Sequence, residues 1–382
     1  MALNCDETSV LEEKIRGFSE GDEPIGMGKH LIFDLTKSEL WKAYFKRLPV
    51  SQQDVYYTPE YYSLYEHYGD GKAECFVFEK GDDVALYPYL INSVNELGYD
   101  LDKEYFDIQG AYGYNGVVSS SYSAEFIGSF YESFNSFARS RNIIAEYTRF
   151  HPLLKNTEFS ADHFQVIPDR KTVYLDLSAG YEEIFKKFQT TTRKQIKRCE
   201  SRFGIETEII EDGTADVEVF YSIYKEAMDR VNSIDYLYFT REYFDELIKN
   251  VKSVVLFAKL DGKPIASIIA LYDDCYLHGH LGGALTEYLN TSSYSLLYSE
   301  MIKYGISKGC RFFNPGGGTT NSPEDKLLQF KLNFSHSMAD FCIGKKVHNQ
   351  TIYDSVVQQW TEKKTEKIEM FNKRLLKYRY WK

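Results

Sequence analysis

Two halves of the chain show the same order of predicted secondary structure, and this repeat limits the fold more than any other feature. In the first half, two helical patterns (36–48 and 58–69) precede a β-hairpin (73–91), a long helix (121–142) and a strand from residue 143. The second half begins with a strand and a helix and then repeats that order. Its segments are 171–178, 181–204, 205–212, 216–230, 240–250, 253–284, 292–309 and 310–316. We therefore predict an α+β fold with two copies of one unit, each a mixed, mostly antiparallel sheet flanked by helices.

Chain length and charge support this division. The 382 residues suit two domains of about 150–200 residues each. We predict an N-terminal domain at 1–168, a C-terminal domain at 169–350 and a basic C-terminal helix at 351–382 that packs on the body. Residues 1–168 carry a net charge of −13, and the remainder carries +2. This balance argues against DNA and general nucleic-acid partners, although an anionic ligand near the basic segments stays open beside the simpler interpretation of solvated helix faces.

The composition favours a reduced cytoplasmic protein. The six cysteines are scattered without a C-x-x-C pair, which disfavours a disulfide framework and a zinc ribbon. The first residues, "MALNCDETSVLEEK", contain no apolar signal core, and no window approaches 18 uninterrupted apolar residues. We therefore expect no membrane span. The 32 tyrosines suit half-wet grooves for polar ligands, or they reflect composition bias in packed strands.

A strand that ends in three glycines is the first candidate site. The glycines are Gly316, Gly317 and Gly318. The segment matches neither G-x-x-x-x-G-K-[ST] nor G-x-G-x-x-G. Glycine permits positive φ and close approach to a ligand, so a plain loop and a ligand-contacting backbone both remain open.

The start of the helix near residue 292 is a second candidate. Thr291, Ser292 and Ser293 are good N-cap residues, and the free N–H groups there would favour a phosphate or carboxylate. Nearly every helix start has this property, so the pattern alone is weak.

Two histidines, His278 and His280, lie two residues apart in a predicted strand and should share one face. No acidic or cysteine partner lies in register with them, and zinc needs at least three protein ligands, so we predict no metal. A structural histidine and a ligand-facing general base both remain open.

The glycine- and tyrosine-rich stretch "GAYGYNGVV" (110–118) precedes the long helix of the first half. It is either an ordinary turn or the lining of a cleft for a sugar or nucleotide, with Tyr112, Tyr114 and Asn115 as contacts.

Five segments in this order resemble a known family, the Fem-like transferases. They are "GAYGYNGVV" (110–118), "EYTRFHPLLKN" (146–156), "TTRKQIKRCESRFGI" (191–205), "LHGHLGGA" (277–284) and "FFNPGGGTTNSPEDKLLQFKLNFS" (312–335). The family comprises peptidoglycan-bridge aminoacyltransferases and relatives with a tandem acetyltransferase-like (GNAT-type) fold. The resemblance is closer to the short acyl-CoA N-acyltransferase-like (BioF2-like) members. It implies two tandem GNAT-like domains with a cleft between them.

The resemblance implies acyl transfer to an amine. Peptidoglycan-bridge members use aminoacyl-tRNA as donor, and shorter relatives are thought to use acyl-CoA with an amino sugar or another small amine. The chain lacks the coiled-coil arm of some tRNA-using members, and its acidic balance disfavours tRNA. The segment "ALTEYLNTSSY" (284–294) lacks the glycine pair of the usual pyrophosphate loop, which counts against ordinary acyl-CoA binding.

We therefore predict an N-acyltransferase that uses an acyl-CoA donor. It would move an acetyl or aminoacyl group to an amine of a cell-envelope or polysaccharide precursor, such as an amino-sugar nucleotide. No nucleophile motif is visible, so direct transfer without a covalent enzyme intermediate is expected. The alternatives are an aminoacyl-tRNA-dependent peptidoglycan-bridge transferase and a non-catalytic member that binds sugar or peptide.

The family motifs assign roles to single residues. Lys331 occupies the lysine of F-K-x-x-F and would neutralise a developing oxyanion or a donor phosphate; the alternative is a surface lysine between two buried phenylalanines. Arg230 matches the arginine after a helix and would clamp a phosphate or carboxylate. Tyr236 and Tyr238 lie where the family often has a cleft tyrosine. The strand of His278 and His280 presents a substrate-contacting side chain in the family.

The predicted sites therefore form three groups. The catalytic residues are Lys331 and His280, although a water or a substrate group remains an alternative general base. The substrate-binding residues are Arg230, Tyr236, Tyr238, His278, Tyr112, Tyr114 and Asn115. The donor-binding residues are Arg193, Lys194, Thr291, Ser292, Ser293, Gly316, Gly317 and Gly318, of which Arg193 and Lys194 are equally consistent with a structural role.

Overall fold

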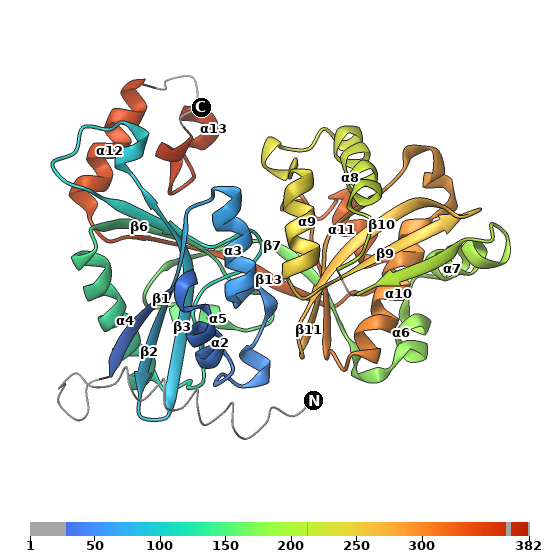
Figure 1. The fold of residues 1–382 in the computed structure, drawn as a ribbon, viewed down its shortest axis with the longest axis horizontal. Coiled ribbons are helices and arrows are strands. Elements are labelled where there is room, and N and C mark those ends of the chain that lie inside the picture. Colours follow the sequence, from blue (N-terminus) through green and yellow to red (C-terminus); the bar gives the residue numbers. More distant parts are fainter. Residues whose placement is uncertain (1–27, 212, 364–367, 381–382) are drawn as a thin grey trace. The chain divides into compact units, whose positions relative to one another are not determined.

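The computed structural model describes residues 28–211, 213–363 and 368–380 (Figure 1). These residues form two compact units. Unit 1 contains 28–52, 57–166 and 343–380, and unit 2 contains 53–56 and 167–342. The expected signal-free N-terminus, with Cys5, lies outside the described residues.

The sheet of unit 1 has the strand order β1-β2-β3-β4-β6-β13, with the short β5 paired to β3. Neighbours are antiparallel except β4 and β6, which are parallel. The strands are β1 (Lys29–Asp34), β2 (Lys72–Lys80), β3 (Asp83–Ser93), β4 (Phe106–Gln109), β5 (Val118–Ser119), β6 (Ile143–Arg149) and β13 (Met338–Val347), whose last residues belong to this unit. The helices are α2 (Ser38–Phe45), α3 (Pro59–Tyr68), α4 (Ala124–Ser140), α5 (Asn156–Ser160), α12 (Gln350–Lys363) and α13 (Ile368–Phe371).

The sheet of unit 2 has the order β7-β12-β11-β10-β9-β8, and its neighbours are antiparallel except β11 and β12. The strands are β7 (Gln165–Asp176), β8 (Glu206–Ile210), β9 (Ser253–Leu260), β10 (Lys263–Tyr272), β11 (Tyr276–Ala284) and β12 (Phe312–Gly317). The helices are α6 (Tyr181–Lys187), α7 (Thr190–Ser201), α8 (Val217–Val231), α9 (Arg241–Asn250), α10 (Ser293–Ser307) and α11 (Lys326–Leu332).

The two units share one topology. Each has four strands in antiparallel succession, then one parallel neighbour reached through a long helix: β4-α4-β6 in unit 1 and β11-α10-β12 in unit 2. In each unit an antiparallel strand follows, β13 or β7. The predicted α+β fold with two mixed, mostly antiparallel sheets is therefore confirmed.

Local signals explain most element boundaries. The Thr58 side chain accepts a hydrogen bond from the backbone N–H of Tyr61 at the start of α3, and Gly69 ends this helix in the left-handed conformation. The continuous helix expected over 181–204 is wrong, because the chain breaks into α6 and α7. Phe188 is buried in extended conformation, and the amide of Gln189 donates to the carbonyl of Asn333, so a tertiary contact replaces helical hydrogen bonds.

The C-terminal segment packs on unit 1. Trp360 and Tyr378 are fully buried in a cluster with residues of the first half, including Val94 and Tyr105. Arg379 Nε donates to both carboxylate oxygens of Asp107 at 2.7 and 2.8 Å. The segment predicted as a separate basic helix at 351–382 thus consists of α12, α13 and a short 3-10 turn within the described residues.

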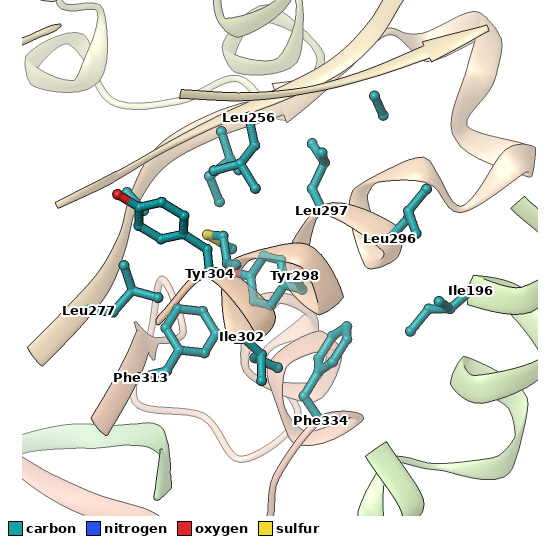
Figure 2. Packing of buried hydrophobic residues seen from close by; sticks show 14 of the residues in the cluster. Ile196, Leu256, Leu277, Leu296, Leu297, Tyr298, Ile302, Tyr304, Phe313 and Phe334 are labelled. Carbon is teal, nitrogen blue, oxygen red and sulfur yellow. The ribbon is translucent and has the colours of Figure 1, made fainter. Parts of the chain in front are cut away.

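The core of unit 2 is built around α10 (Figure 2). Leu296, Leu297 and Ile302 of this helix belong to the core cluster together with alternate residues of β9 and β10, as strand alternation requires. Helix α8 packs on the opposite face of β11, where the Cα of Gly283 comes so close that an added Cβ would lie 2.4 Å from Ala227. This packing fixes the position of β11, which carries the two histidines.

Candidate active site of unit 2

Lys331 is buried at the end of strand β12. Phe330 and Phe334 pack on the ring of Tyr298 in α10, with ring centroids 5.1 and 5.0 Å away. This anchors α11 and leaves the lysine side chain only 7% exposed. Its Nζ donates to the carbonyl of Gly317 at 2.6 Å. The alternative of a surface lysine is therefore wrong, because the anchored helix turns Lys331 inward.

Burial changes the protonation of Lys331. Desolvation lowers the pKa of its amine to about 7, and the carboxylate of Asp325 opposes this shift only in part. Near neutral pH the side chain is therefore present both as an ammonium and as a neutral amine. An ammonium has three N–H donors and the Gly317 carbonyl takes one, so the group can also donate to a developing oxyanion or, when neutral, accept a proton.

The loop after the three glycines is organised by Asp325. One carboxylate oxygen accepts hydrogen bonds from the backbone amides of Thr319 and Thr320 and from both of their hydroxyls, at 2.7–3.0 Å. The other accepts from the amides of Leu327 and Leu328 and so caps α11. Desolvation alone would raise the pKa of Asp325, but these hydrogen bonds hold it far below its ordinary value. The loop amides thus bind a carboxylate of the chain itself.

The conformation and close packing of the loop explain why glycine occupies these three positions. Gly316 adopts a φ of +81°, and its amide donates to the Asn314 side chain. A Cβ at Gly318 would lie 2.5 Å from an oxygen of Asp325, and one at Gly317 would lie 2.6 Å from a backbone carbonyl of β7. The backbone of these glycines therefore lies close to other atoms of the protein. Donor binding by these glycines stays a prediction.

Strands β11 and β12 pair over a short distance only. Their parallel ladder joins Tyr276–His278 to Phe312–Asn314, although β11 continues to Ala284. On its other side β12 pairs with β7 from Phe312 to Gly317, with a register shift between Phe313 and Gly316. Helix α10 starts just beyond β11, so the end of the ladder and a helix N-terminus lie on the same parallel β-α-β unit.

The start of α10 differs in detail from the expectation. Ser292 occupies the N-cap position with a φ of +62°, and its side chain makes no capping hydrogen bond. Thr291 supplies the cap instead: its Oγ1 accepts from the Ser293 amide at 3.2 Å and donates to the Tyr288 carbonyl at 2.6 Å. Ser293 is 1% exposed at the first turn of the helix.

His278 and His280 meet the same tyrosine. The ring of Tyr56 lies 4.8 Å from that of His278, and its hydroxyl lies 3.3 Å from Nδ1 of His280. The hydroxyl of Tyr243 in α9 lies 3.4 Å from Nε2 of the same histidine. The register of β10 against β11 shifts between Ile269 and Ala270, so His280 occupies the extra position of a β-bulge. The expected common face is retained.

His278 has an acidic partner that the sequence did not indicate. Its Nε2–H donates to Oδ2 of Asp54 at 2.6 Å, and both side chains are buried. The expectation that no acidic residue accompanies the histidines is therefore wrong, because Asp54 precedes His278 by 224 residues. Burial, aided by the neighbouring His278, lowers the pKa of His280 to about 3, so this imidazole is neutral at physiological pH.

The other predicted residues of unit 2 lie at its surface. Arg230 is exposed, and its Nη1 donates to the Ala284 carbonyl and to Thr286 Oγ1 at 2.8 and 3.0 Å. These contacts place it beside the end of β11. Tyr236 is 37% exposed and Tyr238 is half-buried in the turn after α8.

Helix α7 carries the basic run. Arg193 is half-buried and donates to Thr190 Oγ1, whereas Lys194 is exposed. Arg198 donates to the carbonyl of Asn290, which holds α7 beside the start of α10.

Tyr112, Tyr114 and Asn115 belong to unit 1. Asn115 is fully buried, and its side chain accepts from the Arg149 amide at 2.8 Å. Its carbonyl accepts from the Asn156 side chain at 2.9 Å. This network joins "GAYGYNGVV" to "RFHPLLKN" and gives Asn115 a structural role. Tyr112 and Tyr114 remain half-buried, so the alternative of an ordinary turn explains only part of the stretch.

Sequence reasoning missed four residues: Asp54, Tyr56, Tyr243 and Asp325. Asp325 had a usable signal, because an Asp before a helical pattern is a common N-cap. The other three reach the histidines from distant segments, so no local pattern could identify them.

Comparison with known proteins decides the enzyme class. Residues 186–331 match the family model described as an acetyltransferase (GNAT) domain, and the match ends at Lys331. The matched region is thus a GNAT-type acetyltransferase domain, and the protein is an acyltransferase. This region contains the β11-α10-β12 unit, both histidines and the glycine loop, whereas Asp54 and Tyr56 lie outside it.

Solved structures agree with the tandem fold. The structure titled "Crystal structure of FemX" matches with a TM-score of 0.65 at 12% identity, over 85% of this chain and 99% of that one. A conserved protein of unknown function from Bacteroides thetaiotaomicron matches with a TM-score of 0.53 at 9% identity, over 82% and 97%. The Fem-like tandem fold implied by the sequence motifs is thus confirmed. No curated protein matches this sequence. Among the described helices, none combines the length and apolarity that crossing a bilayer requires.

Proposed function

We propose that the protein transfers an acyl group from an acyl-CoA thioester to the amine of an anionic amino-sugar precursor. The observation that carries this proposal is the buried amine of Lys331 at the end of β12, just beyond the residues where β11 and β12 stop pairing. A cation in a dry site stabilises the negative charge that develops on a carbonyl oxygen during acyl transfer.

The start of α10 supports a phosphorylated donor. The helix follows β11 after a short 3-10 turn, and the helix dipole and the free N–H groups of its first turn favour negative charge. Arg193 and Lys194 of the neighbouring α7 add positive charge. The donor would lie with its diphosphate near Thr291, Ser292 and Ser293 and its thioester towards Lys331.

The acceptor amine must lose one proton during transfer. Lys331 in its neutral form is a candidate acceptor for this proton, because its pKa lies close to physiological pH. His280 is a weaker proton acceptor, since its pKa is far below 7, and it would act by hydrogen bonding. Arg230 would bind a phosphate or carboxylate of the acceptor, and Tyr236 and Tyr238 are further candidate contacts.

A second candidate donor is aminoacyl-tRNA. Lys194, Lys197, Arg198 and Arg202 are exposed on α7, and such a face suits a phosphodiester backbone. The net charge of −11 for the whole chain weighs against it.

The test offers both donors to the same enzyme. Purified protein would be incubated with a panel of amino sugars and amino-sugar nucleotides. The donor would be acetyl-CoA, a longer acyl-CoA thioester or, in a separate reaction, charged tRNA, and products would be identified by mass spectrometry. Acylated product with release of free CoA is expected. Product from charged tRNA alone would replace the donor assignment, and ligand-induced stabilisation without consumption of any donor would favour a binding protein.

A further inference from the structure

We propose that Asp54 and Tyr56 are positioning residues that orient the neutral His280 for acyl transfer, an inference that rests on the proposed function. Both residues come from a four-residue segment, Gln53–Tyr56, that belongs to unit 2 while the chain on either side belongs to unit 1. No sequence motif and no part of the matched acetyltransferase region includes this segment.

First, a hydrogen bond between two of its own residues fixes the conformation of the segment Gln53–Tyr56. Oδ1 of Asp54 accepts a hydrogen bond from the backbone amide of Tyr56 at 3.0 Å, the two-residue turn that Asp favours. This bond fixes the orientation of the carboxylate. The second oxygen, Oδ2, then points to His278 Nε2 at 2.6 Å.

The second step is the fixing of His278. Its backbone lies at the last position where β11 pairs with β12, opposite Asn314. The Asp54 carboxylate selects the His278 form that carries a proton on Nε2, because only an N–H can donate to it. The ring of His278 becomes a rigid wall, against which the ring of Tyr56 packs edge-on at 4.8 Å and 63°.

The third step is the orientation of His280. The Tyr56 hydroxyl lies 3.3 Å from Nδ1 and the Tyr243 hydroxyl 3.4 Å from Nε2. A neutral imidazole donates through one nitrogen and accepts through the other, so one tyrosine hydroxyl must accept from the ring and the other must donate to it. The tautomer of His280 is therefore coupled to the orientation of both hydroxyls. His280 lies at a β-bulge and has no paired residue on β10. Its side-chain contacts must therefore fix the orientation of the ring.

This arrangement suits a hydrogen-bonding histidine. His280 is uncharged near neutral pH. Its contribution to catalysis therefore depends on which ring nitrogen carries the hydrogen and on the direction of that N–H bond. Asp54 and Tyr56 act on this choice through His278 and the tyrosine hydroxyl. Neither residue needs to touch the substrate.

The kinetic test compares Tyr56→Phe and Asp54→Asn with the wild-type enzyme. Tyr56→Phe removes one hydroxyl and keeps the ring against His278, so we expect kcat to fall about tenfold, the equivalent of one hydrogen bond, with the donor KM unchanged. Tyr181→Phe is the matched control, since it removes a hydroxyl that bonds to Ser299 instead. Asp176→Asn, an exposed carboxylate that makes the same kind of two-residue turn, is the control for Asp54→Asn.

A spectroscopic test does not depend on turnover. Nitrogen NMR shifts of labelled histidine report the tautomer of His280 in the whole protein. We expect one defined neutral tautomer in the wild type and a mixture, or the other tautomer, in Tyr56→Phe. His278→Asn removes a neighbour that lowers the pKa of His280, so the protonation midpoint of His280 should rise.

The outcomes separate this inference from the proposed function. Full kcat in both Tyr56→Phe and Asp54→Asn, with an unchanged tautomer, would overturn the positioning role even if the enzyme acylates its acceptor. If no donor is consumed but the tautomer changes as expected, the hydrogen-bond network stands and the donor assignment fails. If Asp54→Asn does not fold, Tyr56→Phe and the NMR signal of His280 still decide the question.

Discussion

Replacement of Lys331 by methionine separates the free-energy cost of burying the amine from the contribution of the amine to catalysis. Methionine keeps most of the side-chain volume of lysine and removes the amine, so the packing around the side chain should be preserved. If the amine stabilises the transition state, kcat should fall by about 10²–10³, as for loss of one preorganised oxyanion donor. The same change should stabilise the folded protein.

The size of the stabilisation follows from the pKa. Burial lowers the pKa of Lys331 from 10.5 to about 7, so below pH 7 the folded protein holds a charge that would be better solvated in the unfolded chain. This difference corresponds to a cost of no more than about 5 kcal/mol. The cost is complete below pH 7, decreases as the folded amine loses its proton above pH 7, and is gone above the unfolded pKa near 10.

The assay combines chemical denaturation and steady-state kinetics. Lys331→Met should unfold at higher denaturant concentration than wild type at pH 6.5, and the two midpoints should converge as the pH approaches 10. Lys326→Met, an exposed position on the same helix, should change neither the midpoint nor kcat. A Lys331→Met enzyme with full turnover would remove the catalytic assignment. A variant less stable than wild type at pH 6.5 would refute the argument from burial.

Three further changes test the loop and the helix start. Asp325→Asn should cost about 1–2 kcal/mol of unfolding free energy at pH 7, and because the folded pKa of this carboxyl is lowered, the difference should persist above pH 4 and vanish in stronger acid. Gly318→Ala should destabilise the protein by about 1–3 kcal/mol in a urea titration, because its Cβ would meet Asp325. As a control, Gly128→Ala lies in open space within α4 and should stabilise the protein by roughly 0.5–1 kcal/mol in the same titration. Thr291→Val should raise the donor KM in initial-rate assays, with kcat less affected; an unchanged KM would contradict donor binding at α10.

The fold could be predicted largely from local patterns. Helical spacing, strand alternation and turn residues gave the element order of both units, because these signals arise from neighbours in sequence. The break between α6 and α7 could not be predicted, since it depends on the contact of Gln189 with Asn333. The same holds for the segment 343–380, whose place in unit 1 depends on buried contacts of Trp360 and Tyr378 with distant residues.

The candidate site could be predicted only in part from the sequence. The motif pointed to Lys331, but the depressed pKa of its amine depends on burial, which local sequence does not report. The glycine motif left a plain loop and a ligand-contacting backbone both open, and the structure shows that the amides of Thr319 and Thr320 in this loop bind Asp325.

The repeated α+β order and the lysine between two phenylalanines could be read from residue spacing along the chain. The GNAT-type transferase class was implied by the resemblance of five segments to the Fem-like family. Only the tertiary structure decided the partners of the two histidines, because Asp54 lies 224 residues before His278 and Tyr243 approaches His280 from a helix. The protonation of a buried group depends on all atoms that surround it, and those atoms are brought together only by folding.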